Sequence, residues 1–397
     1  MQIGAATSLI FSKSKLIELD SEKKINVLVI PDLFPKFEND VQGIFILDYL
    51  SSTTPYCNNT VLFGRLTSSP KGHVIEQKEH YNLHRFSVSS KKVPFYLKPF
   101  YYILWFVKGY QIGSKIDNID IIHAHGSILS GTLSLLLSKK IKKPFIITEH
   151  QGPFSMTSEN FWKRNWTKYI MQKANAVLTV SHHLKQEILN TQINPKKIIV
   201  THNPVDTNLF KLKAFGLYKT ILFVGRLDNF KGALISLKAF NNIYRENKDW
   251  QFTIIGDGED FAPITKYLEL NPELKTRVHL LGQKTKAEIA QQMQVSDFLV
   301  FPSKHESFGL VITEALSCGL PVIVGNTTAP KEFVDNENGL LVNYDNVKEI
   351  AKAMQNLINS HSSYNSMNIR NKIVENFGFE NFGKKMADIY NSIINKY

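Results

Sequence analysis

The sequence predicts an α/β protein with two doubly wound parallel sheets, one in each half of the chain. Short apolar runs rich in β-branched residues alternate with segments of helical periodicity along most of the 397 residues. The runs are apolar without alternation, which is typical of strands that helices cover on both faces. The chain is also longer than one ordinary domain of roughly 150–200 residues. In such folds ligands bind beyond the carboxyl ends of the strands.

The predicted strands form two series, separated by a polar stretch. Those of the first half span residues 25–30, 119–123, 144–148, 176–180 and 197–201. Those of the second half span residues 220–224, 251–255, 278–281, 297–301 and 321–324. We therefore expect an N-terminal extension at 1–24, a first domain at 25–206, a linker at 207–219, a second domain at 220–378 and a C-terminal helix at 379–397.

The composition is that of a globular protein whose positive charge is unevenly placed. The net charge is +12, and residues 1–210 carry 25 Lys and Arg against 15 Asp and Glu. A basic first half is compatible with solubility alone, with anionic lipid or with a phosphorylated acceptor, and no nucleic-acid-binding motif accompanies it. Cys57 and Cys318 have no partner at metal-site spacing, which favours a reducing compartment over a disulfide or zinc framework.

Two segments bear on targeting and on membranes. In residues 1–25 the lysines follow a weakly apolar stretch, which is the wrong order for a signal peptide. Residues 93–110 are apolar and aromatic, but Lys98 and Lys108 interrupt them, so they do not supply the ~20 apolar residues of a spanning helix. This segment suits either a helix packed on the core or an aromatic contact with a membrane interface.

Two cations follow the first predicted strand of the second half. Arg226 comes directly after Gly225, and Lys231 precedes Gly232 at the expected start of the next helix. Arginine grips phosphate oxygens with a planar fork, lysine acts as a point charge, and a helix start adds N–H donors. Taken alone, the pair would be ordinary exposed side chains near a turn, but with the next motif it predicts a diphosphate site.

A second strand-to-helix turn in the same half carries two glutamates. Glu306 and Glu314 are separated by seven residues, so on a helix their positions lie at most ~12 Å apart. We expect one of them to meet a sugar and the other a ribose. Gly309 permits a close backbone approach, and the amides of Phe308, Gly309 and Leu310 are placed to meet phosphate oxygens.

With these motifs the second half resembles the donor-binding domain of the family 4, or group 1, retaining glycosyltransferases. That family has the GT-B fold, two facing Rossmann-like domains with a cleft between them. The likeness is strong over residues 220–345 and looser over residues 25–206. Besides the Glu-x7-Glu signature it runs through Gly225-Arg226-Leu227, Lys231-Gly232, Gly256-Asp257-Gly258, Leu281-Gly282, Ser296-Asp297, Pro302-Ser303, Glu314-Ala315 and Gly339-Leu340-Leu341-Val342.

The resemblance implies a role for each of these side chains. Arg226 and Lys231 would bind and neutralise the diphosphate of a UDP-, GDP- or ADP-sugar, Glu306 would contact the transferred sugar, and Glu314 would hold the ribose hydroxyls. Fixed cations and helix-end amides can stabilise the departing diphosphate. We therefore expect no cofactor and no divalent metal, and no Asp-x-Asp motif is needed.

The first half matches through Gly43, His123-Ala124-His125-Gly126, Thr148-Glu149-His150, Val180-Ser181 and His202-Asn203-Pro204. The resemblance implies that His125 reaches the donor sugar and that the loop of Gly43 lies near phosphate and acceptor. His150 is a candidate for the acceptor side. Three strand-end histidines near a carboxylate also suit a zinc site. The plainer alternative is that His123 and His125 cap or pack the sheet.

Two loops depart from the family pattern. Residues 41–45 contain Gly43 where many relatives carry two adjacent glycines. Residues 327–332, Thr327-Thr328-Ala329-Pro330-Lys331-Glu332, replace a glycine pair followed by proline and glutamate. Glu332 matches the acidic position of that pattern, and the sequence assigns no role to it.

We therefore expect a retaining sugar transfer from a nucleotide sugar to a glycan or lipid-linked acceptor, in cell-envelope polysaccharide or lipopolysaccharide synthesis. The acceptor would lie on the first domain, the C-terminal helix would cross back onto that domain, and the protein would work in the cytoplasm, with peripheral contact to the anionic inner face of the cell membrane. Nucleic acid is not an expected partner. The alternatives are a nucleotide-sugar-binding protein without turnover and a non-enzymatic membrane-surface module.

Overall fold

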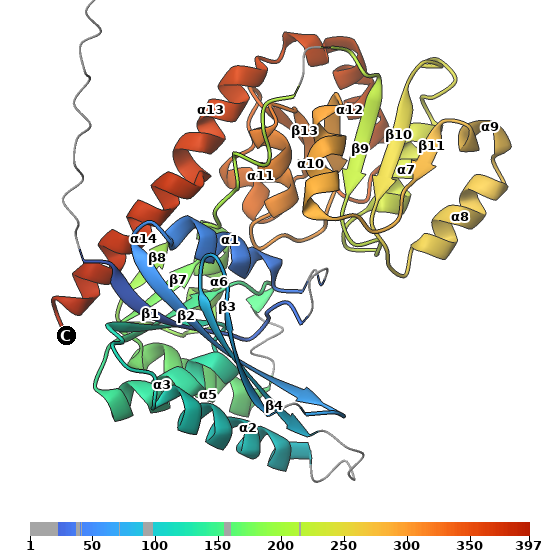
Figure 1. Cartoon of the computed structure of the whole chain (residues 1–397). Helices are drawn as coiled ribbons and strands as arrows, with labels where there is room; N and C mark the ends of the chain where they lie inside the picture. The colour runs from blue at the N-terminus through green and yellow to red at the C-terminus, as the bar shows by residue number, and fades with distance from the viewer. Residues whose placement is uncertain are drawn as a thin grey trace, which may run out of the picture.

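The computed structural model describes residues 23–36, 40, 42–70, 72–89, 98–154, 160–213 and 216–397. It has two α/β lobes with one sheet each, as the sequence predicts (Figure 1). Of the predicted N-terminal extension, residues 1–22 lie outside the described residues, and so do residues 93–97 of the aromatic stretch.

Among the described residues, the first lobe is built on an eight-stranded sheet in the order β3-β4-β2-β1-β5-β6-β7-β8. Neighbouring strands are parallel, except for the antiparallel pair β3 and β4. The strands are β1 (Ile25–Pro31), β2 (Cys57–Thr67), β3 (His73–Gln77), β4 (Asn82–Ser89), β5 (Ile121–His125), β6 (Phe145–Glu149), β7 (Ala176–Thr179) and β8 (Ile198–Val200).

Strands β2, β3 and β4 are not predicted by the sequence pattern. β3 is exposed along most of its length, and β4 mixes buried with partly exposed residues, so neither shows a continuous apolar run. Strand β5 also ends two residues later than predicted, because His125 pairs with Pro31 of β1 and with Thr148 of β6. This pairing places His125 within the sheet.

The second lobe has six parallel strands in the order β11-β10-β9-β12-β13-β14. This is the order 3-2-1-4-5-6 of a dinucleotide-binding fold, with its switch point between β9 and β12. The switch point is where such sheets bind ligands. The strands are β9 (Thr220–Val224), β10 (Gln251–Ile255), β11 (Val278–Leu280), β12 (Phe298–Phe301), β13 (Val322–Gly325) and β14 (Gly339–Val342).

Helices cover both faces of each sheet. In the first lobe α2 (Lys98–Gly113), α3 (Leu129–Ile141) and α5 (Phe161–Lys173) lie together below the sheet in Figure 1, and α1 (Ile44–Thr53) lies above it. α6 (His182–Asn190) follows β7. The second lobe contains α7 (Ala233–Asn241), α8 (Phe261–Glu269), α9 (Pro272–Lys275), α10 (Lys286–Gln294), α11 (Leu310–Ser317), the short turn η2 (Ala329–Glu332), α12 (Val347–Ser360), the turn η3 (His361–Ser363) and α13 (Ser366–Phe377).

The last helix, α14 (Phe379–Ile394), returns to the first lobe and packs against α1 (Figure 1). Gly383 lies directly over the Ser52 carbonyl, where a Cβ would collide with it. The Tyr390 ring is fully buried in the first-lobe core. The two lobes are therefore joined by α14 as well as by the chain around residues 205–220.

Candidate active site between the lobes

A pocket of about 320 Å³ lies between the lobes, beyond the ends of β9 and β12. We call it the interlobe pocket. Of the predicted site residues it gathers Gly225, Lys231, Glu306, Phe308, Gly309, Leu310 and Glu314. The first lobe contributes Phe45, His150 and Asn203, and the remaining lining residues are Val224, Phe301, Ser307 and Val311. Arg226, His125 and Gly43 do not line it.

Lys231 and Glu306 form an ion pair inside the pocket. Lys231 Nζ lies 2.5 Å from Glu306 Oε1, and their side chains are 26% and 11% exposed. The ammonium group also lies 5.7 Å from the centroid of the Phe301 ring. A cation and an anion are thus held together, largely out of water, at the switch point of the sheet.

Asp228 fixes the backbone that carries Lys231. Its Oδ1 accepts hydrogen bonds from the amides of Phe230 and Lys231, each at 3.0 Å. Its other oxygen accepts from Arg226 Nε. The Arg226 side chain is 71% exposed. Asp228 therefore links the two predicted cations, but it directs only Lys231 into the pocket.

Helix α11 begins at the pocket wall. Gly309 is its N-cap with φ 95°, a left-handed conformation that favours glycine. The first amides of any α-helix have no intrahelical acceptor, and Leu310 and Val311 hold these positions beside the pocket. The Phe308 ring is buried against Phe333 and Phe377, which supports the turn from behind. The helix start is thus a fixed donor surface for an anion.

Glu314 also lines the interlobe pocket, and it lies beside an ion pair that joins the lobes. Lys286 Nζ of the second lobe donates to both carboxylate oxygens of Asp48 in the first lobe, at 2.6 Å each. The same nitrogen is 3.9 Å from Glu314 Oε1. Burial raises the pKa of Glu314 to about 7, with Lys286 opposing the shift. No local pattern in the sequence marks Lys286 or Asp48.

The histidines predicted in the first lobe stack at the end of β5 and β6. His123 Nδ1 lies 2.7 Å from the Tyr390 hydroxyl, and its Nε2 lies 2.6 Å from Thr148 Oγ1. His125 Nδ1 lies 2.9 Å from His150 Nε2. Burial lowers the pKa of His123 and His125 well below the usual value, and that of His150 to about 3. All three imidazoles are therefore neutral at pH 7.

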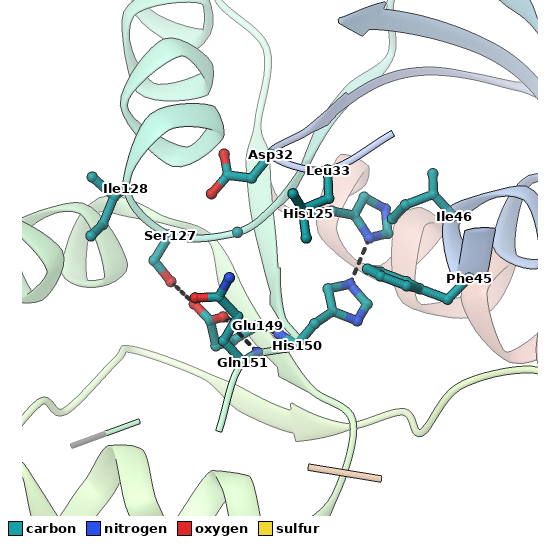
Figure 2. Close-up of a pocket in the computed structure, with 11 residues that line it drawn as sticks. Asp32, Leu33, Phe45, Ile46, His125, Ser127, Ile128, Glu149, His150 and Gln151 are labelled. Carbon is teal, nitrogen blue, oxygen red and sulfur yellow. Dashed lines mark hydrogen bonds between the residues drawn. The ribbon is translucent and has the colours of Figure 1, made fainter. Parts of the chain in front are cut away.

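His125 lines a smaller cavity of about 60 Å³ beside the interlobe pocket, and the two cavities share Phe45 and His150 (Figure 2). The Nε2 atom of His125 is buried and has no hydrogen-bond partner among the described residues. The bond between His125 and His150 fixes where their protons can lie. If His125 Nδ1 donates to His150 Nε2, the Nε2 atom of His125 carries no proton and is an acceptor. If His150 Nε2 donates to His125 Nδ1, the Nε2 atom of His125 carries the proton and is a donor.

Glu149 and Asp32 are the carboxyl groups of this smaller cavity. Glu149 accepts hydrogen bonds from Ser127 Oγ and from the amides of His150 and Gln151, and in Figure 2 it points toward Ser127 and away from the histidines. Burial raises the pKa of both Glu149 and Asp32. Because Thr148 and Tyr390 occupy both nitrogens of His123, these histidines and Glu149 do not converge on a metal ion.

Gly43 is the N-cap of α1 and has φ 75°. A Cβ there would lie 2.5 Å from the Leu33 carbonyl oxygen, so glycine lets this turn pack against the loop after β1. The turn carries Phe45, which does line the interlobe pocket. Gly43 therefore supports the pocket without touching it.

The loop of residues 327–332, one of the two that depart from the family pattern, supports Glu306. Thr328 has φ 36° and ψ −140°, a conformation that costs a threonine strain and that glycine adopts readily. Its Oγ1 accepts a hydrogen bond of 2.9 Å from the Glu306 amide. Nearby, Glu332 accepts bonds from the amides of His182 and His183, at 2.9 and 2.6 Å, and so caps α6 of the first lobe.

Two Rossmann-like lobes with a pocket between them are the arrangement of the GT-B fold. The chain belongs to the group 1 glycosyltransferases, the family that its motifs resemble. The family model described as glycosyl transferases group 1 matches residues 205–374, and the model described as glycosyltransferase family 4 matches residues 62–209.

Individual relatives agree with this assignment. An uncharacterized glycosyltransferase of Methanocaldococcus jannaschii is 31% identical over 269 residues, which are 67% of this chain and 74% of that protein. The UDP-Gal:alpha-D-GlcNAc-diphosphoundecaprenol alpha-1,3-galactosyltransferase of Escherichia coli is 30% identical over 71% of this chain and 78% of its own length.

Solved structures show the same fold. Sucrose-phosphate synthase from Thermosynechococcus elongatus has a TM-score of 0.74 at 18% identity, covering 94% of this chain and 100% of that chain. Anabaena HepE in complex with UDP has a TM-score of 0.71 at 18% identity, covering 93% and 100%.

Proposed function

We propose that this glycosyltransferase is a retaining hexosyltransferase that takes a sugar from a UDP-, GDP- or ADP-sugar and gives it to a glycan or lipid-linked acceptor. We further propose a role in cell-envelope polysaccharide or lipopolysaccharide synthesis. The observation that carries the proposal is the Lys231–Glu306 ion pair beside the start of α11. A donor diphosphate needs a cation such as Lys231, the sugar joined to it needs a hydrogen-bond acceptor such as Glu306, and the two groups must lie side by side.

The donor diphosphate would bind between Lys231 and the first amides of α11. When the glycosyl–phosphate bond breaks, negative charge grows on the departing diphosphate, and a fixed ammonium group and amides stabilise it without reorganising. Lys231 would then exchange part of its contact with Glu306 for phosphate oxygens. Glu306 would in turn accept hydrogen bonds from sugar hydroxyls. This assignment needs no divalent metal ion for the chemistry.

Glu314, which lines the interlobe pocket, would accept hydrogen bonds from the ribose hydroxyls. The first lobe would present the acceptor. Phe45 and His150 line both cavities, and so form the boundary between a donor in the interlobe pocket and the His125 imidazole. For His125 to reach the transferred sugar through its buried Nε2 atom, Phe45 or His150 would have to move aside, and the exposed Arg226 side chain would have to turn toward the diphosphate oxygens.

A membrane-bound acceptor is the form that the surface of the first lobe favours. Helices α2, α3 and α5 share one face of the sheet, and no helix in the described part of the chain is long and apolar enough to span a bilayer. Their exposed apolar side chains are Phe100, Tyr102, Ile103, Leu104, Val107, Leu136, Phe161, Trp162, Trp166 and Tyr169. Lysines and Arg164 lie among them, as on surfaces that bind anionic membranes. The relative from Escherichia coli is named for a diphosphoundecaprenol substrate.

A donor screen tests the proposal. The purified chain is mixed with UDP-, GDP- and ADP-sugars and assayed for thermal shift and for donor turnover, with and without a chelator. We expect one nucleotide class to raise the melting temperature and to be turned over in the presence of chelator. Lys231→Ala and Glu306→Ala should each lower kcat at least about 100-fold, as expected for charged groups that act on the transition state.

The neighbouring variant Lys304→Ala is the matched control and should keep its activity. NMR of the product anomeric proton tests retention against inversion. Near-normal turnover in Lys231→Ala or Glu306→Ala would refute the site, and nucleotide binding without turnover of any donor would favour a binding protein.

A further inference from the structure

A cluster of two imidazoles and one carboxylate bridges the lobes outside the interlobe pocket. His183 and Glu187 lie one turn apart on α6 of the first lobe, and His305 lies in the loop between β12 and α11 of the second lobe. We call these three residues the bridging cluster. One ligand atom from each lies within 4.8 Å of the others. None of the three lines the interlobe pocket.

The distances in the bridging cluster fit a metal coordination shell. Glu187 Oε1 lies 3.2 Å from His183 Nε2 and 3.3 Å from His305 Nε2. Ligands held ~2.05 Å from a tetrahedral Zn²⁺ ion are separated by about 3.3 Å, so both measured separations match an edge of that tetrahedron. Two imidazoles and a carboxylate are also one of the ligand sets that zinc uses with water as its fourth ligand.

Neighbouring contacts support two of the three ligands, Glu187 and His305. The amide of Phe154 donates to Glu187 Oε2 at 3.0 Å, which leaves Oε1 directed at the imidazoles. Gly152 packs on His305, where a Cβ would lie 2.6 Å from ring atom Cε1. Ser303 Oγ donates to the His305 carbonyl at 3.0 Å. Such supporting contacts are what orient metal ligands before the ion arrives.

The positive charge near the cluster is offset by a carboxylate, and the cluster is open to solvent. The positive end of the α6 dipole lies near His183 and would repel one, but the Glu332 carboxylate accepts hydrogen bonds from the first amides of this helix and offsets that charge. The side chains of His183, Glu187 and His305 are 34%, 19% and 15% exposed. An ion can therefore enter from solvent and keep a water molecule as its remaining ligand.

We propose that His183, Glu187 and His305 bind one divalent transition-metal ion, with zinc as the best match, and that this ion clamps the two lobes together. The ligand set is complete only while α6 and the loop of His305 are in contact, so a bound ion favours this arrangement of the lobes. One of its ligands, His305, directly precedes Glu306 in the chain, but none of the three ligands lines the interlobe pocket. Imidazole ligands select zinc and its neighbours over Mg²⁺.

Metal titration of the whole chain tests the clamp. The chain is stripped with a chelator and titrated calorimetrically with Zn²⁺ and separately with Mg²⁺. We expect one Zn²⁺ per chain and no Mg²⁺ at this site. His183→Ala, His305→Ala and Glu187→Gln should each weaken Zn²⁺ binding at least roughly tenfold. The adjacent exposed histidine gives the matched control, His182→Ala, which should bind Zn²⁺ like the unaltered chain.

Hydrogen exchange adds a readout of the clamp itself. Zn²⁺ should slow amide exchange both in α6 and in residues 303–309, and should do so in His182→Ala but not in Glu187→Gln, which keeps the size of the native side chain. Equal Zn²⁺ affinity in all variants, or no Zn²⁺ binding by the unaltered chain, would overturn the proposal and leave Glu187 as a hydrogen-bond acceptor between two imidazoles. No sugar donor enters the titration, so its outcome is independent of the transfer reaction.

Discussion

Lys286 of the second lobe donates hydrogen bonds to both carboxylate oxygens of Asp48 in the first lobe, across 238 positions of sequence. Their side chains are 19% and 12% exposed. Burial raises the pKa of Asp48, and Lys286 opposes this shift. At Lys286 burial lowers the pKa, but the carboxylates of Asp48 and Glu314 outweigh it, so the pKa of Lys286 is raised. The lobes are thus joined beside Glu314 by a nearly buried ion pair.

Removing one partner of this pair should destabilise the protein. Lys286→Met leaves the Asp48 carboxylate buried without its cation, and we expect a loss of about 3 kcal/mol in the free energy of unfolding, measured with urea. The double variant Lys286→Met/Asp48→Leu removes both charges and should recover most of that loss. If the single variant is as stable as the unaltered chain, the interlobe pair does not form in solution.

Donor binding should depend on the ionisation of Glu314. Because burial raises its pKa to about 7, the carboxylate that would accept ribose hydrogen bonds appears only as the pH rises through that value. We expect donor affinity, measured by calorimetry, to increase from about pH 6 to about pH 8. Glu314→Gln should lose about tenfold in affinity at the higher pH and should lose this pH dependence. An unchanged profile in the variant would assign the titration to another group.

The same shift has a consequence for folding stability. The folded-state pKa of Glu314, about 7, lies above the ordinary value of 4.5, so the folded protein holds this proton more tightly than the unfolded chain does. The contribution of Glu314 to stability is therefore complete below pH 4.5 and is lost as the pH rises through 7. Glu314→Gln should be more stable than the unaltered chain at about pH 8, and the difference should shrink toward acidic pH.

Thr328 should position Glu306 through its hydroxyl group. Thr328→Ser keeps the acceptor for the Glu306 amide and should retain activity. Thr328→Gly relieves the strain at φ 36° but removes that acceptor, so we expect kcat to fall roughly tenfold while the free energy of unfolding changes by less than about 1 kcal/mol. A glycine variant as active as the serine variant would show that the hydroxyl has no positioning role.

The contact between α14 and α1 should tolerate no side chain at Gly383. In Gly383→Ala the new Cβ meets the Ser52 carbonyl, and we expect a loss of about 2 kcal/mol in unfolding experiments. The next residue along the helix is exposed, and Lys384→Ala is its matched control, with little expected change. Equal stability of the two variants would mean that α14 does not pack closely on the first lobe.

The exposed aromatic side chains of α5 should bind membranes. Phe161 and Trp162 are 61% and 79% exposed. The double variant Phe161→Ser/Trp162→Ser should bind vesicles of anionic phospholipid roughly tenfold more weakly in a sedimentation assay. Leu270→Ser removes an equally exposed apolar side chain from the second lobe and should not affect binding. Retained binding by the double variant would place the membrane contact elsewhere on the protein.

Local pattern predicts the parts of this protein that local chemistry decides. The bounds of β9 and β10 agree with the predicted strands, because continuous apolar runs mark buried parallel strands. The motifs of Lys231, Glu306 and Gly309 lie at strand ends and helix starts, where the fold brings them to one edge of a sheet. The sequence pattern does not predict strands β3 and β4, because they are partly exposed and have no continuous apolar run.

The sequence by itself determined two parallel-sheet lobes, the family and which loops of the second lobe meet. Only the tertiary structure decided which residues join the lobes: Asp48 with Lys286, Glu332 with α6, and His305 with Glu187. It also separated His125 and Arg226 from the pocket that contains Lys231 and Glu306. The physical reason is that hydrophobic periodicity fixes each sheet and its helices, whereas contacts between surfaces 118 to 238 positions apart depend on how the finished lobes dock.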